Sequence, residues 1–378
     1  MNHLFIKITN KKFSFFILYF FLGINLFIVT INYIIDPFQI YRKTSLYTFK
    51  IEDQRYLNAG LAKNYPYDTL ITGSSMVENF YLKDVSKNKK FSKPINLALQ
   101  GASIYEEKDL LNLAIRSNKN LKNIIFSLDF YSFNADAKYK YTASTFPKYL
   151  YDSSIFNDIE YLFNYKILRK SFRSLELPYN KSIVEKNLDS IYNWQKLYNH
   201  TFTLQNVVSQ YNYAEKLYKN EQSIFTKKFR FKILKNNFDK NLFPILQKNQ
   251  HINFYIFYPP YSILAYKMME KQYIFQDILK FKHYIFSKIQ TLPNVYLYDF
   301  QVAFELTNNL HNYKDLNHYN ERINKKLLLY IEKQKYLVQK NNIDTYINIF
   351  SKNVEKYTFD TKLMYNSPQT LKKAPNAL

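Results

Sequence analysis

Two adjacent serines lie where a hydroxyl group could act as a nucleophile. Residues 68–72 (DTLIT) have the apolar character of a buried strand and are followed at once by Gly73, Ser74 and Ser75. Open α/β sheets keep their sites at the carboxyl ends of such strands. A helix that begins there directs free backbone N–H groups at the hydroxyl, which suits an intermediate that carries an oxyanion. A serine that only caps a helix would give the same pattern.

Glycine marks a second strand end. The chain has 4 glycines, whereas average usage would give about 26 in a chain of this length, so we expect the remaining ones where a side chain is not tolerated. Residues 95–99 (INLAL) read as another buried strand, and Gln100 and Gly101 follow it. Gly73 and Gly101 therefore fall at one edge of the predicted sheet, where a bare N–H can approach a reacting oxygen. A simple turn glycine is the alternative.

A histidine and an aspartate near the end of the chain could activate a serine. Asp315 and His318 are three residues apart and lie between the last predicted strand and the last amphipathic helix. An imidazole can take the proton of a serine, and a carboxylate can hold that imidazole in the right tautomer. A helix cap with a surface histidine is the alternative, and His311 is a reserve candidate for the base. No further cluster of His or carboxylates has ligand spacing, so we predict no metal site and no cofactor.

The elements that must position these residues follow a regular alternation. Short apolar runs alternate with helical patterns, which is typical of a three-layer α/β domain on a mainly parallel sheet. We predict strands at 68–72, 95–99, 124–130, 252–258 and 295–300, and helices around 110–115 and 323–331. The domain should cover residues 68–338, and residues 339–378 should form a C-terminal extension that is partly frayed.

Residues 134–250 interrupt the alternation because they contain no convincing buried strand. We predict a mostly helical insertion there, with one amphipathic helix over residues 155–168. The insertion either lies over one edge of the sheet and shapes a substrate cleft, or it simply extends the core.

An apolar segment near the amino terminus predicts a membrane anchor. Residues 13–35 carry no charge, and as a helix they would be roughly 35 Å long, enough for a hydrocarbon core of about 30 Å. Asp36-Pro37 should end this helix. Because no cleavage site follows, we predict an uncleaved signal anchor and not a removable signal peptide; a buried core helix is the alternative. We expect residues 1–12 in the cytoplasm, residues 36–67 as a connecting segment, and the body outside the cytoplasm at the cell (inner) membrane.

Composition excludes several classes of protein. Zero cysteines exclude disulfides, thiolate catalysis and iron–sulfur clusters, and 47% hydrophobic residues exclude an intrinsically disordered chain. The chain has 53 Lys+Arg and 30 Asp+Glu, a formal net charge of +23. These basic residues are scattered and form no nucleic-acid motif, so we predict a solvated surface and no nucleic-acid partner, with attraction to anionic lipid or an acidic glycan as the alternative.

The order Gly-Ser-Ser, Gly, Asp-x-x-His resembles the SGNH (GDSL-like) hydrolase superfamily. The resemblance is closer to its membrane-anchored bacterial branch, the DltD-like and alginate-acetylation-like proteins that handle acyl groups on cell-envelope polymers, and it covers roughly residues 68–331 without the insertion. It implies a flavodoxin-like fold and a triad of Ser75 as nucleophile, His318 and Asp315. It also implies an oxyanion hole made by the N–H groups of Ser75 and Gly101.

One motif departs from the family pattern. The family has Gly-x-Asn-Asp after the third strand, whereas residues 127–130 read Ser-Leu-Asp-Phe. The asparagine that donates to the oxyanion is therefore missing or replaced, with Asn79 or Asn134 as substitutes, and Ser74, Asn79 and Asp129 as possible cleft residues. Loss of one such donor costs about 3 kcal/mol in the transition state. This weakens the case for efficient hydrolysis but leaves acyl transfer open.

Together these features predict a membrane-anchored serine esterase or O-acyltransferase that acts outside the cytoplasm on acyl groups of cell-envelope polysaccharide. Its expected partners are an acylated glycan or other envelope polymer and, as the resemblance implies, an integral-membrane acyltransferase. The alternative is a non-catalytic protein of the same fold that binds a glycan or such a partner.

Overall fold

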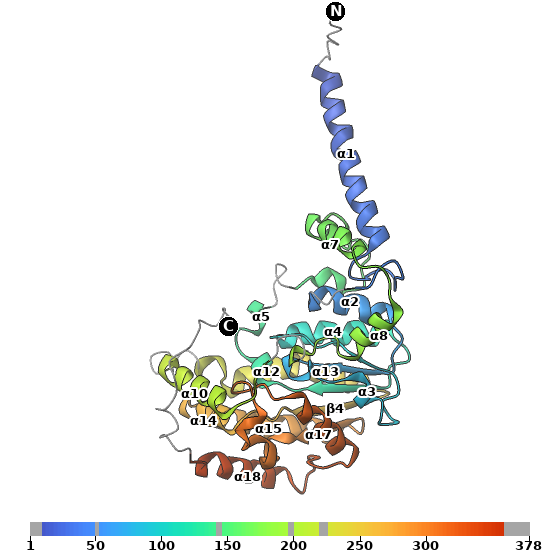
Figure 1. Cartoon of the computed structure of the whole chain (residues 1–378). Coiled ribbons are helices and arrows are strands. Elements are labelled where there is room, and N and C mark those ends of the chain that lie inside the picture. Colours follow the sequence, from blue (N-terminus) through green and yellow to red (C-terminus); the bar gives the residue numbers. More distant parts are fainter. Residues whose placement is uncertain (1–9, 50–52, 141–145, 196–199, 219–225, 359–378) are drawn as a thin grey trace, which may run out of the picture.

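The body of the protein is built on a five-stranded parallel sheet (Figure 1). The computed structural model describes residues 10–49, 53–140, 146–195, 200–218 and 226–358. The sheet has the strand order β2-β1-β3-β4-β5, and every neighbouring pair is parallel. The strands are β1 (Thr69–Thr72), β2 (Pro94–Asn96), β3 (Asn123–Ser127), β4 (Asn253–Tyr258) and β5 (Val295–Asp299). The predicted α/β class with a parallel sheet is confirmed.

Strands β1 and β3 are buried along their whole length and β4 at all but its first residue, as continuous apolar runs predict for a parallel sheet. In the register, Ile71 of β1 lies beside Ile125 of β3, and Ile125 lies beside Tyr255 of β4. Each strand is shorter than predicted, by two residues in β2 and β3 and by one in the others. After β2 the chain still follows β1, because the N–H of Leu99 donates to the carbonyl of Gly73 at 2.9 Å. After β3 the chain turns into a 3-10 helix, which Asp129 caps.

Helices connect the strands and cover the sheet. They are α2 (Gln54–Asn64), α3 (Leu82–Val85), α4 (Ile104–Ser117), α14 (Ile263–Lys271), α15 (Phe275–Ile289), α16 (Phe304–Thr307) and α17 (Glu321–Glu332). Single 3-10 turns are η1 (Ser75–Val77), η2 (Phe130–Phe133), η3 (Lys148–Leu150), η4 (Phe300–Val302) and η5 (Leu310–Asn312). α4 begins with a capping box of Ser103 and Glu106, packs against α2 and contains the residues 110–115 predicted as helical.

The regular elements that the structure describes between β3 and β4 are all helices. It forms α5 (Ala137–Lys140), α6 (Ile159–Leu162), α7 (Tyr165–Leu175), α8 (Lys181–Asp189), α10 (Leu204–Tyr218), α12 (Phe231–Asn241) and α13 (Phe243–Lys248). The prediction of one amphipathic helix over residues 155–168 is wrong. Residues 155–158 are not helical, and Asn164 separates α6 from α7 because its side chain accepts the N–H groups that begin α7.

Helix α1 (Asn10–Ile35) extends away from the body (Figure 1). Residues 12–35 are long and apolar enough to cross a membrane. The helix ends where expected, at Asp36, which has a positive φ of 49°. The buried Asp36 carboxylate accepts the N–H groups of Ile40, Tyr41 and Arg42 and the hydroxyl of Tyr161, at 2.8 to 3.3 Å. The end of α1 is thereby fixed to the body.

The chain beyond residue 338 contributes to the core. Helix α18 (Ile343–Lys356) packs against α14 and α15, and its Phe350 and Val354 are fully buried. The polar end of the predicted extension, residues 359–378, lies outside the described residues, as do residues 1–9 of the predicted cytoplasmic tail.

Candidate active site

Three of the predicted site residues lie in one hydrogen-bonded chain. The Oγ of Ser75 is 2.8 Å from Nε2 of His318. On the other side of the ring, Nδ1 of His318 lies 2.8 and 3.0 Å from the two carboxylate oxygens of Asp315. Residues 243 positions apart in the sequence thus meet with the spacing of a nucleophile, a base and a group that orients the base.

The end of β1 places Ser75. Gly73 has a φ of +134°, and a Cβ atom there would lie 2.9 Å from both Cβ and the carbonyl oxygen of Ser127 in β3. Glycine is therefore required by backbone conformation and by the close approach of the neighbouring strand. Ser74 then caps η1, with its Oγ accepting the N–H of Met76, and η1 begins with Ser75. The serine is half-buried at the carboxyl edge of the sheet.

The loop after η5 places the histidine. Asp315 accepts the backbone N–H groups of Asn317 and His318 at 2.9 and 2.7 Å, so the carboxylate also holds the loop that carries its partner. The carbonyl of Leu316 accepts both the N–H and the hydroxyl of Ser262. Tyr319 donates its hydroxyl to the carbonyl of Met76 at 2.9 Å and so connects this loop directly to the serine turn.

The charges of the pair stabilise each other. Burial acts to raise the pKa of Asp315, but the His318 imidazole, the Lys314 ammonium 3.5 Å away and the backbone N–H of His318 hold it well below its usual value. Burial acts to lower the pKa of His318, but the charge and hydrogen bond of Asp315 outweigh it, so this pKa is raised. Asp315 is therefore an ionised carboxylate at neutral pH, and it increases the basicity of the imidazole.

Two backbone N–H groups are available at the predicted oxyanion hole. In the part of the chain that the structure describes, neither the N–H of Ser75 nor that of Gly101 donates a hydrogen bond. Gly101 has a φ of +60° and is exposed, with open space around a Cβ position. The glycine is therefore required by the turn and not by a close neighbour.

Two residues of α2 hold the loop before Gly101. The N–H of Gln100 donates to Oε1 of Gln54 at 2.6 Å, and the Gln100 carbonyl accepts from Nη2 of Arg55 at 3.2 Å. Arg55 is itself held by an ion pair with the buried Glu106 at 2.8 Å. These positioning residues lie in the segment expected only to connect anchor and body. Their role could not be predicted from the sequence, because the contact depends on how α2 packs on α4.

Asp129, at the position where the resemblance implies a donor asparagine, makes hydrogen bonds that support the local structure. Its carboxylate accepts the hydroxyl of Ser74 at 2.9 Å, the N–H of Tyr131 at 3.0 Å and the hydroxyl of Tyr261. The hydrogen bond between Asp129 and Ser74 thus supports the turn that carries Ser75. Both oxygens of Asp129 therefore act as hydrogen-bond acceptors, and its side chain has no amide group that could donate to an oxyanion.

The other candidates have no bond to the triad. Asn134 uses its amide locally, donating to the carbonyl of Tyr131 and accepting from Asp136. The side-chain oxygen of Asn79 is buried and has no hydrogen-bond partner among the described residues. His311, the reserve candidate for the base, lies exposed on η5.

Two further side chains near His318 were not predicted. Trp194, from the segment between β3 and β4, places its ring 5.8 Å from the imidazole ring. Glu78, one turn after Ser75, is buried and bonds to Gln54, and burial raises its pKa to about 7 although His318 and Lys314 oppose this. The spacing of three residues from Ser75 could have marked Glu78 as a candidate site residue. The burial of its side chain could not be predicted from the sequence.

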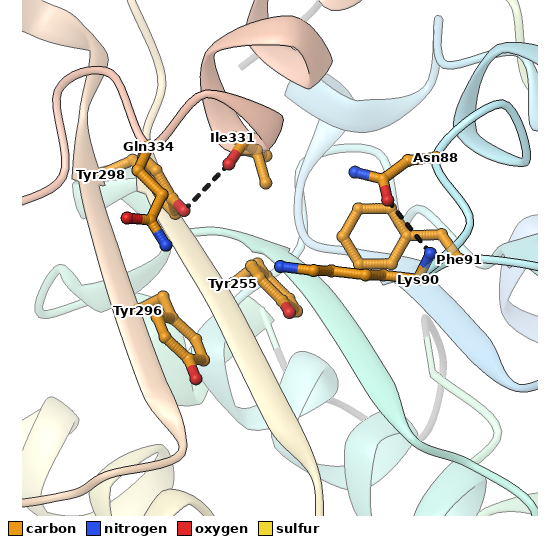
Figure 2. Close-up of a pocket in the computed structure, with 8 residues that line it drawn as sticks. All are labelled: Asn88, Lys90, Phe91, Tyr255, Tyr296, Tyr298, Ile331 and Gln334. Atoms are coloured by element: carbon orange, nitrogen blue, oxygen red, sulfur yellow. Dashed lines mark hydrogen bonds between the residues drawn. The ribbon is translucent and has the colours of Figure 1, made fainter.

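A separate small cavity of about 60 Å³ lies between the sheet and the loops over it (Figure 2). Its lining residues are Asn88, Lys90, Phe91, Tyr255, Tyr296, Tyr298, Ile331 and Gln334, none of which belongs to the triad. Figure 2 shows the tyrosines projecting from β4 and β5 into this space, with Tyr298 bonded to the carbonyl of Ile331. Ligand pockets usually measure about 300–1,000 Å³, so this cavity is too small for a substrate.

Within the described ranges, no group of three or more His, Asp or Glu side chains is placed to hold a metal ion. Comparison of the chain with protein-family models and with curated proteins finds no matching family and no matching sequence. The geometry of the site is therefore what indicates a function.

Proposed function

We propose that this chain is a membrane-anchored serine esterase or O-acyltransferase that acts outside the cytoplasm on acyl groups of cell-envelope polysaccharide. The observation that carries the proposal is the chain of hydrogen bonds from Ser75 through His318 to Asp315. A serine, an imidazole and a buried carboxylate in this order form the arrangement used for acyl transfer on several unrelated folds.

The first half of the reaction acylates the serine. Oγ of Ser75 attacks the carbonyl carbon of an ester, and its proton passes to Nε2 of His318. Asp315 stabilises the imidazolium that forms. The tetrahedral intermediate then collapses, the bond to the leaving alcohol breaks, and the alcohol takes the proton back from His318. The products of this half are a free alcohol and an acyl ester on Ser75.

The second half releases the acyl group. Water or a sugar hydroxyl attacks the acyl ester, His318 takes the proton of the attacking oxygen, and the bond to Ser75 breaks as Ser75 regains its proton. Water gives a free acid, whereas a sugar hydroxyl gives a modified glycan. The same residues serve both outcomes.

Two backbone donors support the intermediates. The unused N–H groups of Ser75 and Gly101 would stabilise the oxyanion, and Gln54 and Arg55 hold the second of them in place through Gln100. A third donor is absent where Asp129 replaces the asparagine of the family pattern. One donor is worth about 3 kcal/mol, so we expect both acylation and release to be slow, which weakens the case for efficient hydrolysis and leaves acyl transfer open.

The fold and location are part of the same proposal. Right-handed crossovers, the rule for parallel strands, would place the β1-to-β2 connection on one face of the sheet and the later connections on the other, as in a flavodoxin-like three-layer fold of the SGNH type. Helix α1 would cross the cell (inner) membrane once, with the body outside the cytoplasm. An integral-membrane acyltransferase that supplies acyl groups fits this placement as a partner.

The position of Asp129 also favours one alternative. Because its carboxylate is committed to Ser74, Tyr131 and Tyr261, a non-catalytic protein of the same fold could keep this network for stability and bind a glycan or a membrane partner. The two functions differ in whether Ser75 reacts.

Fluorophosphonate labelling of the full chain in detergent tests the proposal. We expect an adduct on Ser75, mapped by mass spectrometry, that is lost in Ser75→Ala and falls at least about a thousandfold in rate in His318→Ala. His311→Ala is the matched control, because it removes an exposed histidine near the same loop.

Absence of labelling in a chain with a cooperative unfolding transition would reject the enzyme and favour the binding alternative. Equal labelling rates in His318→Ala and His311→Ala would reject the base assigned here.

A further inference from the structure

Helix α7 is attached to the last turn of α1. Asn32 of α1 is fully buried and donates to the carbonyls of Leu162 and Asn164 at 2.8 and 3.1 Å, just before α7 begins. Ser171, in the middle of α7, donates its hydroxyl to Oδ1 of Asn32 at 3.1 Å. Asn32 lies three residues before the end of α1 at Ile35, about 5 Å along the helix axis. Figure 1 shows α7 beside this end of α1.

This attachment leaves an apolar surface uncovered. α7 buries Ile167 and Ser171 against the rest of the protein. Three apolar side chains of the same helix are exposed: Tyr165, Phe172 and Leu175. The exposed fraction of Tyr165 is 74%. The preceding segment adds a further set of exposed apolar side chains, with Phe156 at 86%: Ile155, Phe156, Ile159 and Phe163. Single exposed apolar residues need no explanation, but a set of seven next to a membrane-length helix does.

A basic stripe flanks the apolar one. Lys166, Arg169, Lys170 and Arg173 follow the spacing i, i+3, i+4, i+7, so they share one side of α7. The apolar residues Tyr165 and Phe172 are seven apart and share the neighbouring side. α7 contains no acidic residue. Apolar and basic stripes side by side are typical of helices that lie in the interface of an anionic membrane.

We propose that α7, with the segment 155–163 before it, lies in the surface of the bilayer that α1 enters, with Tyr165, Phe172 and Leu175 among the acyl chains and the basic stripe on anionic lipid headgroups. The inference rests on the part of the proposed function that makes α1 a membrane anchor. The end of a membrane-spanning helix lies at the membrane surface, and α7 is bonded to that end. Its exposed face therefore meets the headgroup region without any movement of the body.

The positive charge of the α7 surface favours a lipid contact and not a protein partner. A helix that docks into the groove of an integral-membrane protein presents apolar residues and few charges at its contact. α7 instead presents four cations on eight consecutive residues. Near an anionic membrane each such cation contributes about 1 kcal/mol, which falls off with added salt.

The absence of native cysteines allows a direct test in the full chain. Nitroxide labels are placed at Phe172→Cys in α7, at Leu26→Cys in α1 and at Leu329→Cys in α17, all exposed positions. α17 lies on the opposite side of the body from α7 in Figure 1. The chain is reconstituted in nanodiscs of phosphatidylcholine and phosphatidylglycerol, and collision with oxygen, which enters lipid, is compared with collision with a water-soluble nickel chelate.

We expect the oxygen-to-nickel ratio of the Phe172 label to approach that of the Leu26 label and to exceed that of the Leu329 label several-fold. Reversal of Arg169 and Arg173 to Glu should lower the ratio at Phe172, as should omission of phosphatidylglycerol. Reversal of Arg322 and Lys326 to Glu in α17 is the matched control, with the same change of charge and the same spacing, and should leave the ratio unchanged.

A Phe172 label with the low ratio of the Leu329 label, while the Leu26 label reports lipid, would overturn this inference alone and make the α7 surface a site for a protein partner. A Leu26 label that reports water would overturn the anchor of the proposed function, and this inference with it. An equal drop in ratio for the α17 charge reversal would show a general effect of charge and reject the basic stripe as a lipid contact.

Discussion

The indole ring of Trp194 lies edge-on to the imidazole of His318, with ring centroids 5.8 Å apart and ring planes at 86°. The Nζ of Lys314 lies over the same indole, 4.5 Å from its centroid. Trp194 is the single tryptophan of the chain and comes from the segment between β3 and β4. That segment therefore contributes to the surroundings of the histidine and does more than extend the core.

Trp194 should report the charge of His318. An imidazolium quenches a nearby indole more than a neutral imidazole does, so we expect emission, excited where tyrosine does not absorb, to fall as the pH decreases through the pKa of His318. Asp315 raises this pKa, which places the midpoint above the usual value of about 6.5. His200 also contacts the indole, but burial lowers its pKa, so its step should lie at lower pH.

His318→Gln should remove the upper step only, and His200→Gln the lower step only. An upper step that survives in His318→Gln would refute the assignment.

The pH dependence of serine labelling should follow the same group. Only neutral His318 can take the proton of Ser75, so the rate should fall as the pH decreases through the raised pKa of His318. Asp315→Asn removes the carboxylate that raises this pKa. We expect the rate to fall by about 10⁴-fold, as for an imidazole in the wrong tautomer, and the acid limb to move to lower pH. Fluorophosphonate labelling rates between pH 5 and 9 measure both effects, and an acid limb at the same pH in Asp315→Asn would contradict them.

Gln54 should affect the rate through Gln100. Its side chain accepts the N–H of Gln100 and donates to the buried Glu78, so Gln54→Ala frees the loop that carries Gly101. We expect the labelling rate of Ser75 to fall about tenfold, which corresponds to one hydrogen bond of about 1.4 kcal/mol.

Asn64→Ala is the matched control, because this amide at the other end of α2 bonds to the carbonyls of Gln39 and Ile40, away from the triad. It should lower the free energy of unfolding and leave the labelling rate of the folded protein unchanged. Equal rates for the two variants would remove Gln54 from the site.

Gly73→Ala should destabilise the fold strongly. A Cβ atom at this position meets Ser127 at 2.9 Å, and the φ of +134° is strained for any L side chain. We expect a loss of about 3 kcal/mol or more in the free energy of unfolding. Gly101→Ala, which meets no atom within 4 Å at a φ of +60°, should cost only about 1–2 kcal/mol. Chemical denaturation in detergent measures both, and similar losses would contradict the packing described at β3.

The elements that carry the triad could be predicted because they depend on local patterns. Buried runs of apolar residues marked all five strands, and a chain poor in glycine drew attention to Gly73 and Gly101. The single helix over residues 155–168 was wrong because apolar spacing continues through Asn164, whose side chain ends one helix and begins another. The apolar residues there are spaced as in one amphipathic helix, but several of them are exposed in the structure.

Side chains that act through tertiary contacts could not be predicted. Gln54 and Trp194 reach the site only because α2 and the segment after α8 fold back onto it, and a single sequence contains no record of these contacts. The role of Asp129 is similar. The sequence identified a missing donor, whereas its three hydrogen bonds became evident only with Ser74 and Tyr261 brought beside it.

In the proposed membrane-anchored enzyme, the fixed end of α1 would hold the active site at a set distance from the membrane. A flexible linker would let the body move to different distances from the bilayer. Here the hydrogen bonds of Asp36 to Ile40, Tyr41 and Tyr161 restrict the junction between α1 and the body. A serine mounted in this way would stay within a thin layer at constant distance from the membrane. For the proposed activity, substrate selection would then depend on distance from the membrane as well as on chemistry, since an acyl group above or below that layer would be out of reach of Ser75.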